Sequence, residues 1–325
     1  MPSTISRYQG WIEHEIRKQK YGSDPTSLYE PIRYLMGLGG KRLRPMLTLL
    51  SYGLFQNDVK RIVKYATAVE AFHNFTLMHD DIMDNAPLRR GKPTVHEKWN
   101  VSTAILSGDV MLVKVYDMLL SIETDKLKRV FKAFNKCASE VCEGQQWDME
   151  FESVKTVTEA QYINMIKLKT AVLLGFSLEL GAILAGASEN DCKALREFGT
   201  NIGIGFQLKD DLLDAYGDPK KFGKQIGGDI ISNKKTFLLI KAIEKARGKA
   251  RGELLQWLSA KKFRKHEKVT AVTSLYDSMA IPALTEKKVD HYFDKGFRQL
   301  HLLSCPPEAI ANIKSFTEAL IVRQS

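Results

Sequence analysis

Cysteine is scarce in this sequence. The 325 residues include four cysteines, scattered as Cys137, Cys142, Cys192 and Cys305. They are too few and too far apart for a disulfide framework or a zinc site. The N-terminal segment is polar and has no apolar core of the kind found in a signal peptide. We therefore exclude a disulfide-stabilised scaffold and expect a protein of the cytoplasm.

Proline is also scarce through the middle of the chain. None of the ten prolines lies between Pro93 and Pro219, or between Pro219 and Pro282, and proline breaks helix interiors. Apolar residues in the first window recur every three or four positions, as on one face of a helix. Alternating strand patterns are rare. We predict a single all-α domain, a helical bundle over residues 1–325.

Long hydrophobic runs are missing as well. The longest apolar stretch, Ala171–Ala187, has 17 residues and is interrupted by Ser177 and Glu179. A membrane span needs about 20 predominantly apolar residues. We predict a buried core helix in this stretch and no integral membrane segment.

Acidic residues are fewer than basic ones, and the imbalance is local. The chain has 48 Lys and Arg against 38 Asp and Glu, a net charge of +10. Twelve basic and three acidic residues lie between Lys234 and Lys268, so nine of these ten charges fall there. No zinc-finger spacing, RNA-recognition signature or basic zipper accompanies them. We predict a solvated helical face and a loop, and no nucleic-acid partner.

One acidic motif is present twice. Each copy has the form DDxxD and ends an apolar-periodic segment; the first comprises Asp80, Asp81 and Asp84, the second Asp210, Asp211 and Asp214. Positions i and i+4 share a helix face, so each copy pairs its first and last carboxylates. Oxygen ligands of this kind suit Mg²⁺, which bridges carboxylates to substrate phosphates. A solvated helix end is the alternative, but the repetition of the motif argues against it.

Basic loops rich in glycine and proline accompany the acidic motifs. They read GLGGKRLRP, NAPLRRGKP and GDPKKFGKQIGG, and they carry Lys41, Arg42, Arg44, Arg89, Arg90 and Lys224. Arginine binds phosphate oxygens through two parallel hydrogen bonds, and lysine acts as a point charge. The Walker A pattern of a P-loop is absent from the sequence. Side chains and metal ions, rather than a backbone cradle, would therefore hold a diphosphate.

The order and spacing of these motifs resemble those of the trans-isoprenyl diphosphate synthases, the head-to-tail prenyltransferases that include farnesyl and geranylgeranyl diphosphate synthases. The matching segments are GGKRLRP, HDDIMDNAPLRRGKPTVH, the pair Lys169-Thr170, GFQLKDDLLDAYGDPKKFGK and NKKT, between Gly39 and Thr236. The resemblance implies the isoprenoid synthase fold, an all-α bundle around a central active-site cavity, usually in a homodimer. It also implies isoprenoid diphosphates as substrates and about three Mg²⁺ ions per site.

The resemblance further implies a role for each matching residue. The magnesium ligands correspond to Asp80, Asp84 and Asp210, with Asp81 and Asp214 in support, and we take Asp214 as a fourth ligand. The isopentenyl diphosphate site corresponds to Lys41, Arg44, His73 and Arg90. The allylic diphosphate site corresponds to Arg89, Lys169, Gln207, Lys224 and Lys234, with Lys235 as the alternative to Lys234. Lys169, Thr170 and Gln207 form the catalytic set, Thr170 facing the developing carbocation. Gln145 and Asp148 resemble a further family motif, GQxxD.

Residues upstream of the first acidic motif bear on the length of the product. Phe75 lies five positions before Asp80 and Phe72 eight, about 7.5 Å and 12 Å along a helix, and Thr76 lies four before. In this family a bulky residue near these positions forms a floor that limits elongation. The pattern resembles C20 synthases more than longer-chain ones, and C15 stays open. Core packing is the alternative role for both phenylalanines.

Three other functions compete with chain elongation. A class I terpene cyclase or a head-to-head synthase also uses Asp-rich helices and magnesium, but it does not need the GGKRLRP loop and the Arg89-Arg90 pair. A non-catalytic partner subunit would be expected to lose one acidic motif, and a nucleic-acid binder has only composition in its favour. The sequence therefore favours a Mg²⁺-dependent condensation of isopentenyl diphosphate with dimethylallyl, geranyl or farnesyl diphosphate.

Overall fold

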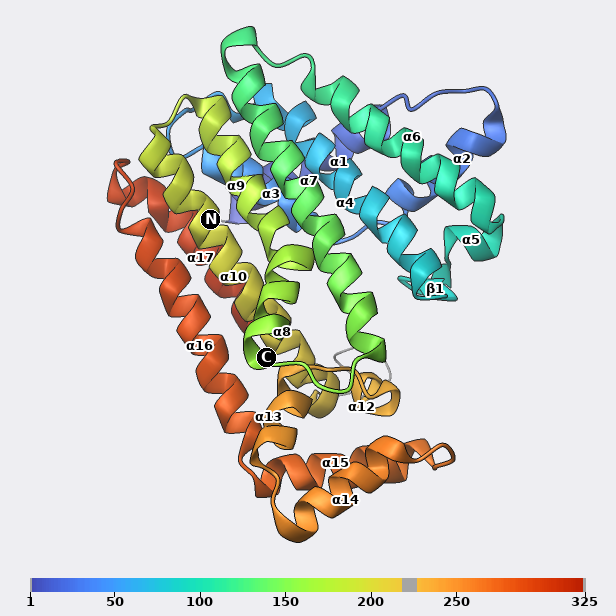
Figure 1. The fold of residues 1–325 in the computed structure, drawn as a ribbon. Coiled ribbons are helices and arrows are strands. Elements are labelled where there is room, and N and C mark those ends of the chain that lie inside the picture. Colours follow the sequence, from blue (N-terminus) through green and yellow to red (C-terminus); the bar gives the residue numbers. More distant parts are fainter. Residues whose placement is uncertain (1, 218–226, 324–325) are drawn as a thin grey trace. The chain divides into compact units, whose positions relative to one another are not determined.

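Helices dominate the structure, a computed structural model that describes residues 2–217 and 227–323 (Figure 1). The all-α prediction is confirmed, and strands in this part of the chain are limited to the antiparallel pair β1 (Leu88–Arg89) and β2 (Lys92–Pro93). The first helices are α1 (Pro2–Lys18), α2 (Thr26–Gly37), α3 (Leu43–Tyr52), η1 (Val59–Ile62), α4 (Val63–Met83), α5 (Val95–Lys98), α6 (Val101–Leu119) and α7 (Thr124–Ser153). They are followed by α8 (Glu159–Ile166), η2 (Lys167–Ala171), α9 (Val172–Ala185), α10 (Glu189–Tyr216), α12 (Gly228–Ser232), α13 (Phe237–Lys245), α14 (Gly248–Ser259), α15 (Lys265–Ser278), α16 (Ile281–Leu300) and α17 (Pro307–Arg323).

The chain divides into two compact units, each described here by itself. The first takes the chain up to Lys136 together with Phe176–Arg196 and Leu303–Ile313. The second takes Cys137–Gly175, Glu197–Leu302 and the chain from Lys314 onward. One domain over residues 1–325 stays a prediction.

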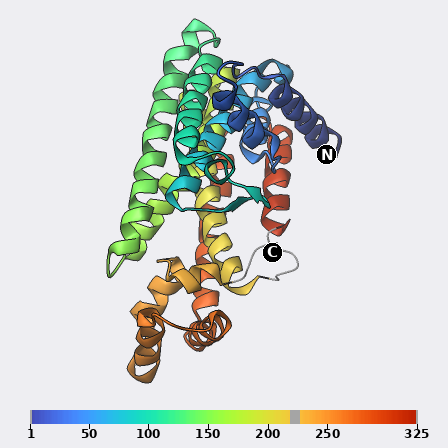
Figure 2. The same cartoon turned by 90° about the vertical axis from the view of Figure 1, so that its right-hand side faces the viewer.

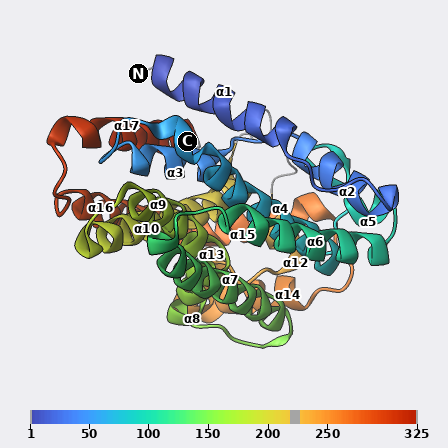
Figure 3. The ribbon, with the colours of Figure 1, turned by 90° about the horizontal axis from the view of Figure 1, so that it is seen from above.

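In the first unit, α4 and α6 lie side by side (Figures 1 and 3). A Cβ atom on Gly108 of α6 would lie 2.2 Å from Nε2 of His79 on α4, so glycine lets the His79 ring keep this position. The same Nε2 lies 3.2 Å from the carbonyl oxygen of Ile105. This contact fixes α4 one turn before its C-terminal end, where the first acidic motif lies.

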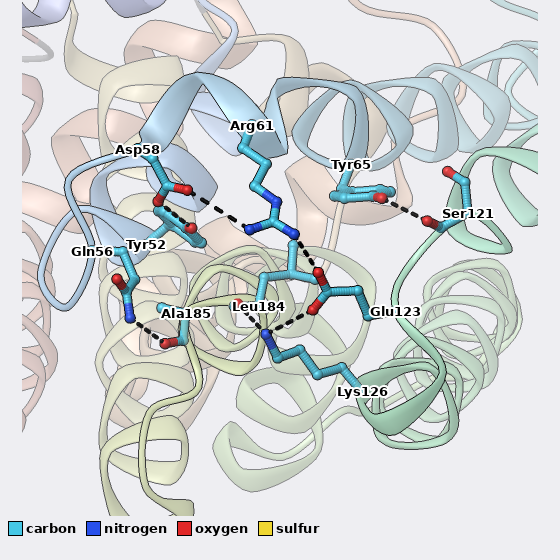
Figure 4. Close-up of polar contacts among 10 residues, drawn as sticks. All are labelled: Tyr52, Gln56, Asp58, Arg61, Tyr65, Ser121, Glu123, Lys126, Leu184 and Ala185. Carbon is cyan, nitrogen blue, oxygen red and sulfur yellow. Dashed lines mark hydrogen bonds and ion pairs between the residues drawn. The ribbon is translucent and has the colours of Figure 1, made fainter.

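The other end of α4 is fixed by a polar cluster around a cavity of about 270 Å³ (Figure 4). Arg61 contacts Glu123, and Lys126 donates to Glu123 at 3.3 Å and to the Leu184 carbonyl at 3.1 Å. Gln56 donates to the carbonyl of Ala185 at 3.1 Å. These contacts join the start of α4 to the α6–α7 connection and to the end of α9. Because the polar groups bond to one another, we assign the cluster a structural role.

In the second unit, the helices from α12 to α16 share an apolar core. Its buried members include Leu238 and Leu239 of α13, Leu254 of α14 and Tyr276 of α15. Helix α14 packs against α15 (Figures 1 and 2). Most basic residues of the Lys234–Lys268 window are exposed or partly exposed, as predicted, but Lys268 is fully buried.

The segment Glu159–Ala185 contains the predicted core helix. Its N-terminus is fixed by a capping box, in which Thr158 and Gln161 bond each other's backbone and side chain. Among the described helices this segment is long and apolar enough to cross a membrane, but 83% of its apolar window is buried inside the protein. That burial is typical of a core helix. The sequence did not predict the π-helical turn η2 that interrupts it at Lys167–Ala171.

Candidate active site

The first acidic motif spans the last turn of α4 and its C-cap, Asp84. Asp80 is partly buried and Asp84 is exposed, whereas Asp81 is 2% exposed. Asp81 accepts hydrogen bonds from Arg89, at 2.5 Å from Nη2 to Oδ1 and 3.1 Å from Nε to Oδ2. The middle carboxylate therefore anchors the β1–β2 hairpin to α4. Asp80 and Asp84, which have i, i+4 spacing, are the first and last carboxylates of the motif, and we call them its outer carboxylates.

The glycine-rich loop before α3 is organised around a buried arginine. Arg42 is 2% exposed, has a left-handed backbone with φ 46°, and forms ion pairs with Glu13 at 2.9 Å and Glu70 at 2.8 Å. It also donates to the carbonyl oxygen of Met36 at 2.8 Å. Arg42 is thus a structural residue of the loop, and the predicted ligands Lys41 and Arg44 flank it.

Three predicted ligands of isopentenyl diphosphate gather in this unit. Arg90 donates to the carbonyl oxygen of Gly39, and a Cβ atom on Gly40 would lie 3.0 Å from the Arg90 guanidinium. Burial, together with the charges of Arg44 and Arg90, lowers the pKa of His73 well below its usual value. His73 is therefore neutral at physiological pH, and the cluster of Arg44, His73 and Arg90 has the composition of an anion site. Lys41 lies exposed on the same loop.

The second acidic motif lies in the last two turns of α10 and again has a buried middle member. Asp211 accepts hydrogen bonds from the Tyr162 hydroxyl and from Gln207 Nε2, the latter at 3.2 Å. Burial raises the pKa of Asp211 to about 7, the nearby charge of Asp229 adds to this rise, and the two hydrogen bonds oppose it. Neither Tyr162 nor Asp229 was predicted, because neither belongs to a motif.

The outer carboxylates of the second motif are Asp210 and Asp214. Asp210 is partly buried, and so is Asp214. Oδ2 of Asp214 accepts a hydrogen bond from the backbone N–H of Asp229 at 2.9 Å. Asp214 therefore links α10 to the start of α12, in addition to its predicted role as a metal ligand.

The π-helical turn η2 carries Lys169 and Thr170. Lys169 Nζ forms an ion pair with Asp148 Oδ2 at 2.5 Å, which unites two predicted positions. The Thr170 hydroxyl donates to Gln207 Oε1 over a long 3.4 Å. π-Helical turns occur frequently at functional sites, and here the turn carries two members of the predicted catalytic set.

Two glycines allow neighbouring helices to approach this turn. A Cβ atom on Gly144 of α7 would lie 2.1 Å from the backbone nitrogen of Lys169. A Cβ atom on Gly203 of α10 would lie 2.7 Å from the Cα atom of Ala171. Both distances are far below van der Waals contact, so the position of η2 depends on glycine at each site.

Two adjacent lysines follow α12, and their side chains take different directions. Lys235 Nζ donates to the carbonyl oxygen of Glu152 in α7 at 3.0 Å. Lys234 is exposed, lines a small cavity together with Asp211 and Asp229, and lowers the pKa of Asp211 by its charge. These contacts favour Lys234 over Lys235 as the ligand near the second acidic motif. Lys224, the other lysine predicted here, lies outside the described residues.

The predicted chain-length residues belong to a cluster of aromatic rings in the first unit. Phe72 is 1% exposed, and its ring lies edge-on to Phe134 with centroids 5.1 Å apart. Phe75 is partly exposed and contacts the rings of Phe72 and His79, at 5.7 Å and 4.8 Å. Thr76 donates its hydroxyl to the carbonyl oxygen of His73 at 2.8 Å. Of the two phenylalanines, Phe75 is the more accessible candidate for a floor.

The residues available to hold a metal ion are paired carboxylates. Within residues 2–217 and 227–323 there is no group of three or more His, Cys, Asp or Glu side chains arranged to hold an ion. Each acidic motif instead offers two outer aspartates, of which Asp214 also accepts from the backbone N–H of Asp229, and a buried middle aspartate that bonds to protein side chains. Such an incomplete, all-oxygen donor set fits Mg²⁺, which keeps several water ligands and takes others from substrate phosphates. It does not fit a structural zinc site, which needs four protein ligands.

Comparison with known proteins gives the class to which this fold and site belong. The chain belongs to the polyprenyl synthetase family, whose model matches residues 25–276. The predicted resemblance is thereby confirmed.

Individual relatives cover most of the chain. It is 40% identical to the short chain isoprenyl diphosphate synthase of Methanocaldococcus jannaschii over 269 residues, 82% of this chain and 81% of that protein. It is 37% identical to the geranylgeranyl diphosphate synthase of Methanosarcina mazei over 289 residues, 88% and 87% of the two chains. The crystal structure of a geranylgeranyl pyrophosphate synthase superposes with a TM-score of 0.94 at 41% identity, covering 99% of each chain. The predicted isoprenoid synthase fold is confirmed by this match.

Proposed function

We propose that the protein is a Mg²⁺-dependent head-to-tail prenyltransferase that condenses isopentenyl diphosphate with an allylic diphosphate and releases diphosphate. The observation that carries this proposal is the cluster of Arg44, His73 and Arg90, none of which belongs to an acidic motif. An enzyme that ionises one allylic diphosphate needs the acidic motifs and one set of cations. A second cationic site is required only where a second diphosphate is bound, as in chain elongation.

Each group of residues then has a defined task. Arg44, Arg90 and neutral His73, with Lys41 beside them, bind the diphosphate of isopentenyl diphosphate. Arg89, Lys169, Lys224 and Lys234 contribute positive charge toward the allylic diphosphate. Charge of this sign stabilises the diphosphate as it leaves, because negative charge accumulates on it when the C–O bond breaks.

Thr170 and Gln207 act on the organic part of the substrate. The Thr170 hydroxyl is placed to donate to Gln207 Oε1, and its oxygen lone pairs would face the allylic cation. The double bond of isopentenyl diphosphate attacks that cation, and the released diphosphate takes the proton whose loss restores an alkene. Because no protein nucleophile takes part, a Ser–His or Cys–His pair is not required.

Asp80, Asp84, Asp210 and Asp214 would hold the magnesium ions, about three per site. When bound, these ions neutralise the leaving diphosphate. The four carboxylates serve as ligands in this scheme rather than as general bases.

Elongation assays test the proposed function directly. With Mg²⁺, isopentenyl diphosphate and dimethylallyl, geranyl or farnesyl diphosphate, we expect a longer prenyl diphosphate that chromatography can size. EDTA should stop turnover and added Mg²⁺ should restore it. Turnover that continues in EDTA would contradict the metal requirement. If no primer were elongated, the function as a non-catalytic partner subunit would remain instead of chain elongation.

We propose a C20 product in preference to C15. Phe75 supports this length, since its partly exposed ring lies about one and a half helical turns before Asp80. Phe75→Ala should shift the products toward longer chains, because removing the ring lowers the floor. Phe72→Ala is the matched control: the Phe72 ring is fully buried, and its loss should mainly reduce stability, by about 3–5 kcal/mol. An unchanged product distribution in Phe75→Ala would remove Phe75 as the floor.

We also propose that the chain is a single prenyltransferase domain that works as a homodimer in the cytoplasm. Helix α6 supports the dimer, because it exposes several large apolar side chains at helical spacing: Val101, Ile105, Leu106 and Val113, followed by Leu120. Exposed apolar patches of this kind mark protein interfaces. Sedimentation equilibrium should give twice the chain mass, and Val113→Asp should shift the mass toward that of one chain. A monomer at all concentrations would refute the dimer.

A further inference from the structure

Lys268 is a buried lysine in a window of otherwise largely exposed cations. It lies in the first turn of α15 and has a relative exposure of 0%. Its ammonium donates to Oδ1 of Asn233 at 2.7 Å and to the carbonyl oxygen of Ile231 at 3.2 Å. It also lies 4.3 Å from the centroid of the Phe263 ring. Burial of an ammonium is unfavourable unless its hydrogen bonds are satisfied, so these acceptors account for its position.

The acceptors of Lys268 belong to the C-terminal end of α12. Helix α12 ends at Ser232, and Asn233 caps it with a left-handed backbone, φ 58°. A cation at a helix C-terminus stabilises carbonyl groups that lack intrahelical partners. Asn233 is held from a second direction, because its Nδ2 donates to the carbonyl oxygen of Leu258 at 3.0 Å. Lys268 and the end of α14 therefore fix the conformation of this turn together.

Lys234 is the residue that follows this turn. Its backbone N–H donates to the carbonyl oxygen of Asp229 at 2.9 Å, and its carbonyl oxygen accepts from Thr236 N–H at 2.8 Å. The backbone of Lys234 is therefore fixed while its side chain is exposed at the small cavity shared with Asp211 and Asp229. A shift of Asn233 would move the origin of the Lys234 side chain directly.

We propose that Lys268 is a positioning residue, which holds the α12–α13 turn so that Lys234 reaches the allylic diphosphate. This inference rests on the proposed function, since it assigns Lys234 to that substrate. Lys268 does not touch the substrate itself. Its buried contacts supply the rigidity that a flexible lysine ligand on a short turn otherwise lacks.

Kinetics of Lys268→Met test the inference. Methionine has nearly the same length but cannot donate to Ile231 or Asn233. We expect KM for the allylic diphosphate to rise about tenfold, as expected for loss of a charge-assisted hydrogen bond. The KM for isopentenyl diphosphate should stay within about twofold, because Lys268 contacts Ile231, Asn233 and Phe263, and none of these is a predicted ligand of that substrate. Lys265→Met, an exposed lysine on the same helix, is the control and should change neither value.

A second variant covers the case in which Lys268→Met does not fold. Asn233→Gly suits the left-handed backbone and removes the side chain that Lys268 and Leu258 hold. Asn233→Gly should raise KM for the allylic diphosphate. In the double variant the two effects should not add, because both changes break the contact between Lys268 and Asn233. The proposal would be overturned if the allylic KM stayed unchanged in both single variants. It would also be overturned if KM for the allylic diphosphate and KM for isopentenyl diphosphate rose equally.

Calorimetry separates this inference from the proposed function. A thiolodiphosphate analogue of geranyl diphosphate, which resists ionisation, is titrated into each variant with Mg²⁺ present. Weaker binding in Lys268→Met and Asn233→Gly, but not in Lys265→Met, supports the positioning role even if the wild-type protein yields no elongated product. Equal binding by all variants contradicts it even if elongation is observed.

Discussion

Asp80→Ala is expected to lower kcat by a factor of roughly a thousand or more while leaving the thermal unfolding midpoint unchanged. The magnitude follows from the loss of a ligand to ions that stabilise the leaving group, a contribution worth several kcal/mol. Stability should be kept because Asp80 lies at the partly exposed end of α4. Steady-state kinetics and thermal unfolding measure the two effects, and Asp210→Ala should behave in the same way.

Asp81→Asn is the matched comparison, one residue further along the same helix. Asp81 is buried against Arg89, and removing one partner of such a pair destabilises a protein by about 3 kcal/mol or more. The outer carboxylates are untouched, so the fraction that folds should lose far less activity than Asp80→Ala, even though Arg89 loses its partner. If Asp80→Ala retained wild-type turnover, the assignment of the outer carboxylates to magnesium would be wrong.

Gly144→Ala should lower kcat about a hundredfold, although residue 144 carries no reactive group. The added methyl group would lie 2.1 Å from the backbone nitrogen of Lys169, so α7 and η2 must separate. Lys169 and Thr170 then move, and a displacement of about 1 Å at a reacting centre can cost a factor of about 100 in rate. Kinetics and circular dichroism of the purified variant check this result.

Gly252→Ala provides the control for this substitution. Gly252 lies in α14, and a Cβ atom there would meet nothing within 4 Å. Activity should be unchanged, and stability should rise by about 0.5–1 kcal/mol, because alanine favours a helix interior more than glycine does. Full activity in Gly144→Ala would mean that η2 tolerates displacement, and the close approach would then have no catalytic consequence.

The sequence predicted the helical class and the position of both acidic motifs because these follow from spacing. Helical periodicity placed Asp80 with Asp84 on one face; Asp80 lies in the last turn of α4 and Asp84 caps its C-terminus. Spacing alone did not reveal that Asp81 bonds to Arg89 and Asp211 to Tyr162, since these partners lie on the β1–β2 hairpin and on α8. Tertiary contacts of this kind leave no local pattern.

Two further features depended on packing that the sequence does not display. The position of η2 depends on the close approach of α7 and α10 at Gly144 and Gly203, and neither glycine belongs to a turn signal. Lys268 was expected on a solvated face because its neighbours are charged, yet it is buried beneath the α12–α13 turn. In both cases the role of a residue was predicted from its neighbours in the sequence, whereas its neighbours in space determine that role.

The glycines at the helix crossings have a consequence for mutational tolerance. Gly108, Gly144 and Gly203 lie inside helices, where glycine is ordinarily replaceable, and each one faces an atom of another helix within 2.7 Å of an added Cβ. In a saturation-mutagenesis experiment these positions should reject every substitution as strictly as the aspartates do. Intolerance to substitution in this protein therefore marks helix crossings as well as ligands, and a map of essential positions would overstate the extent of the active site.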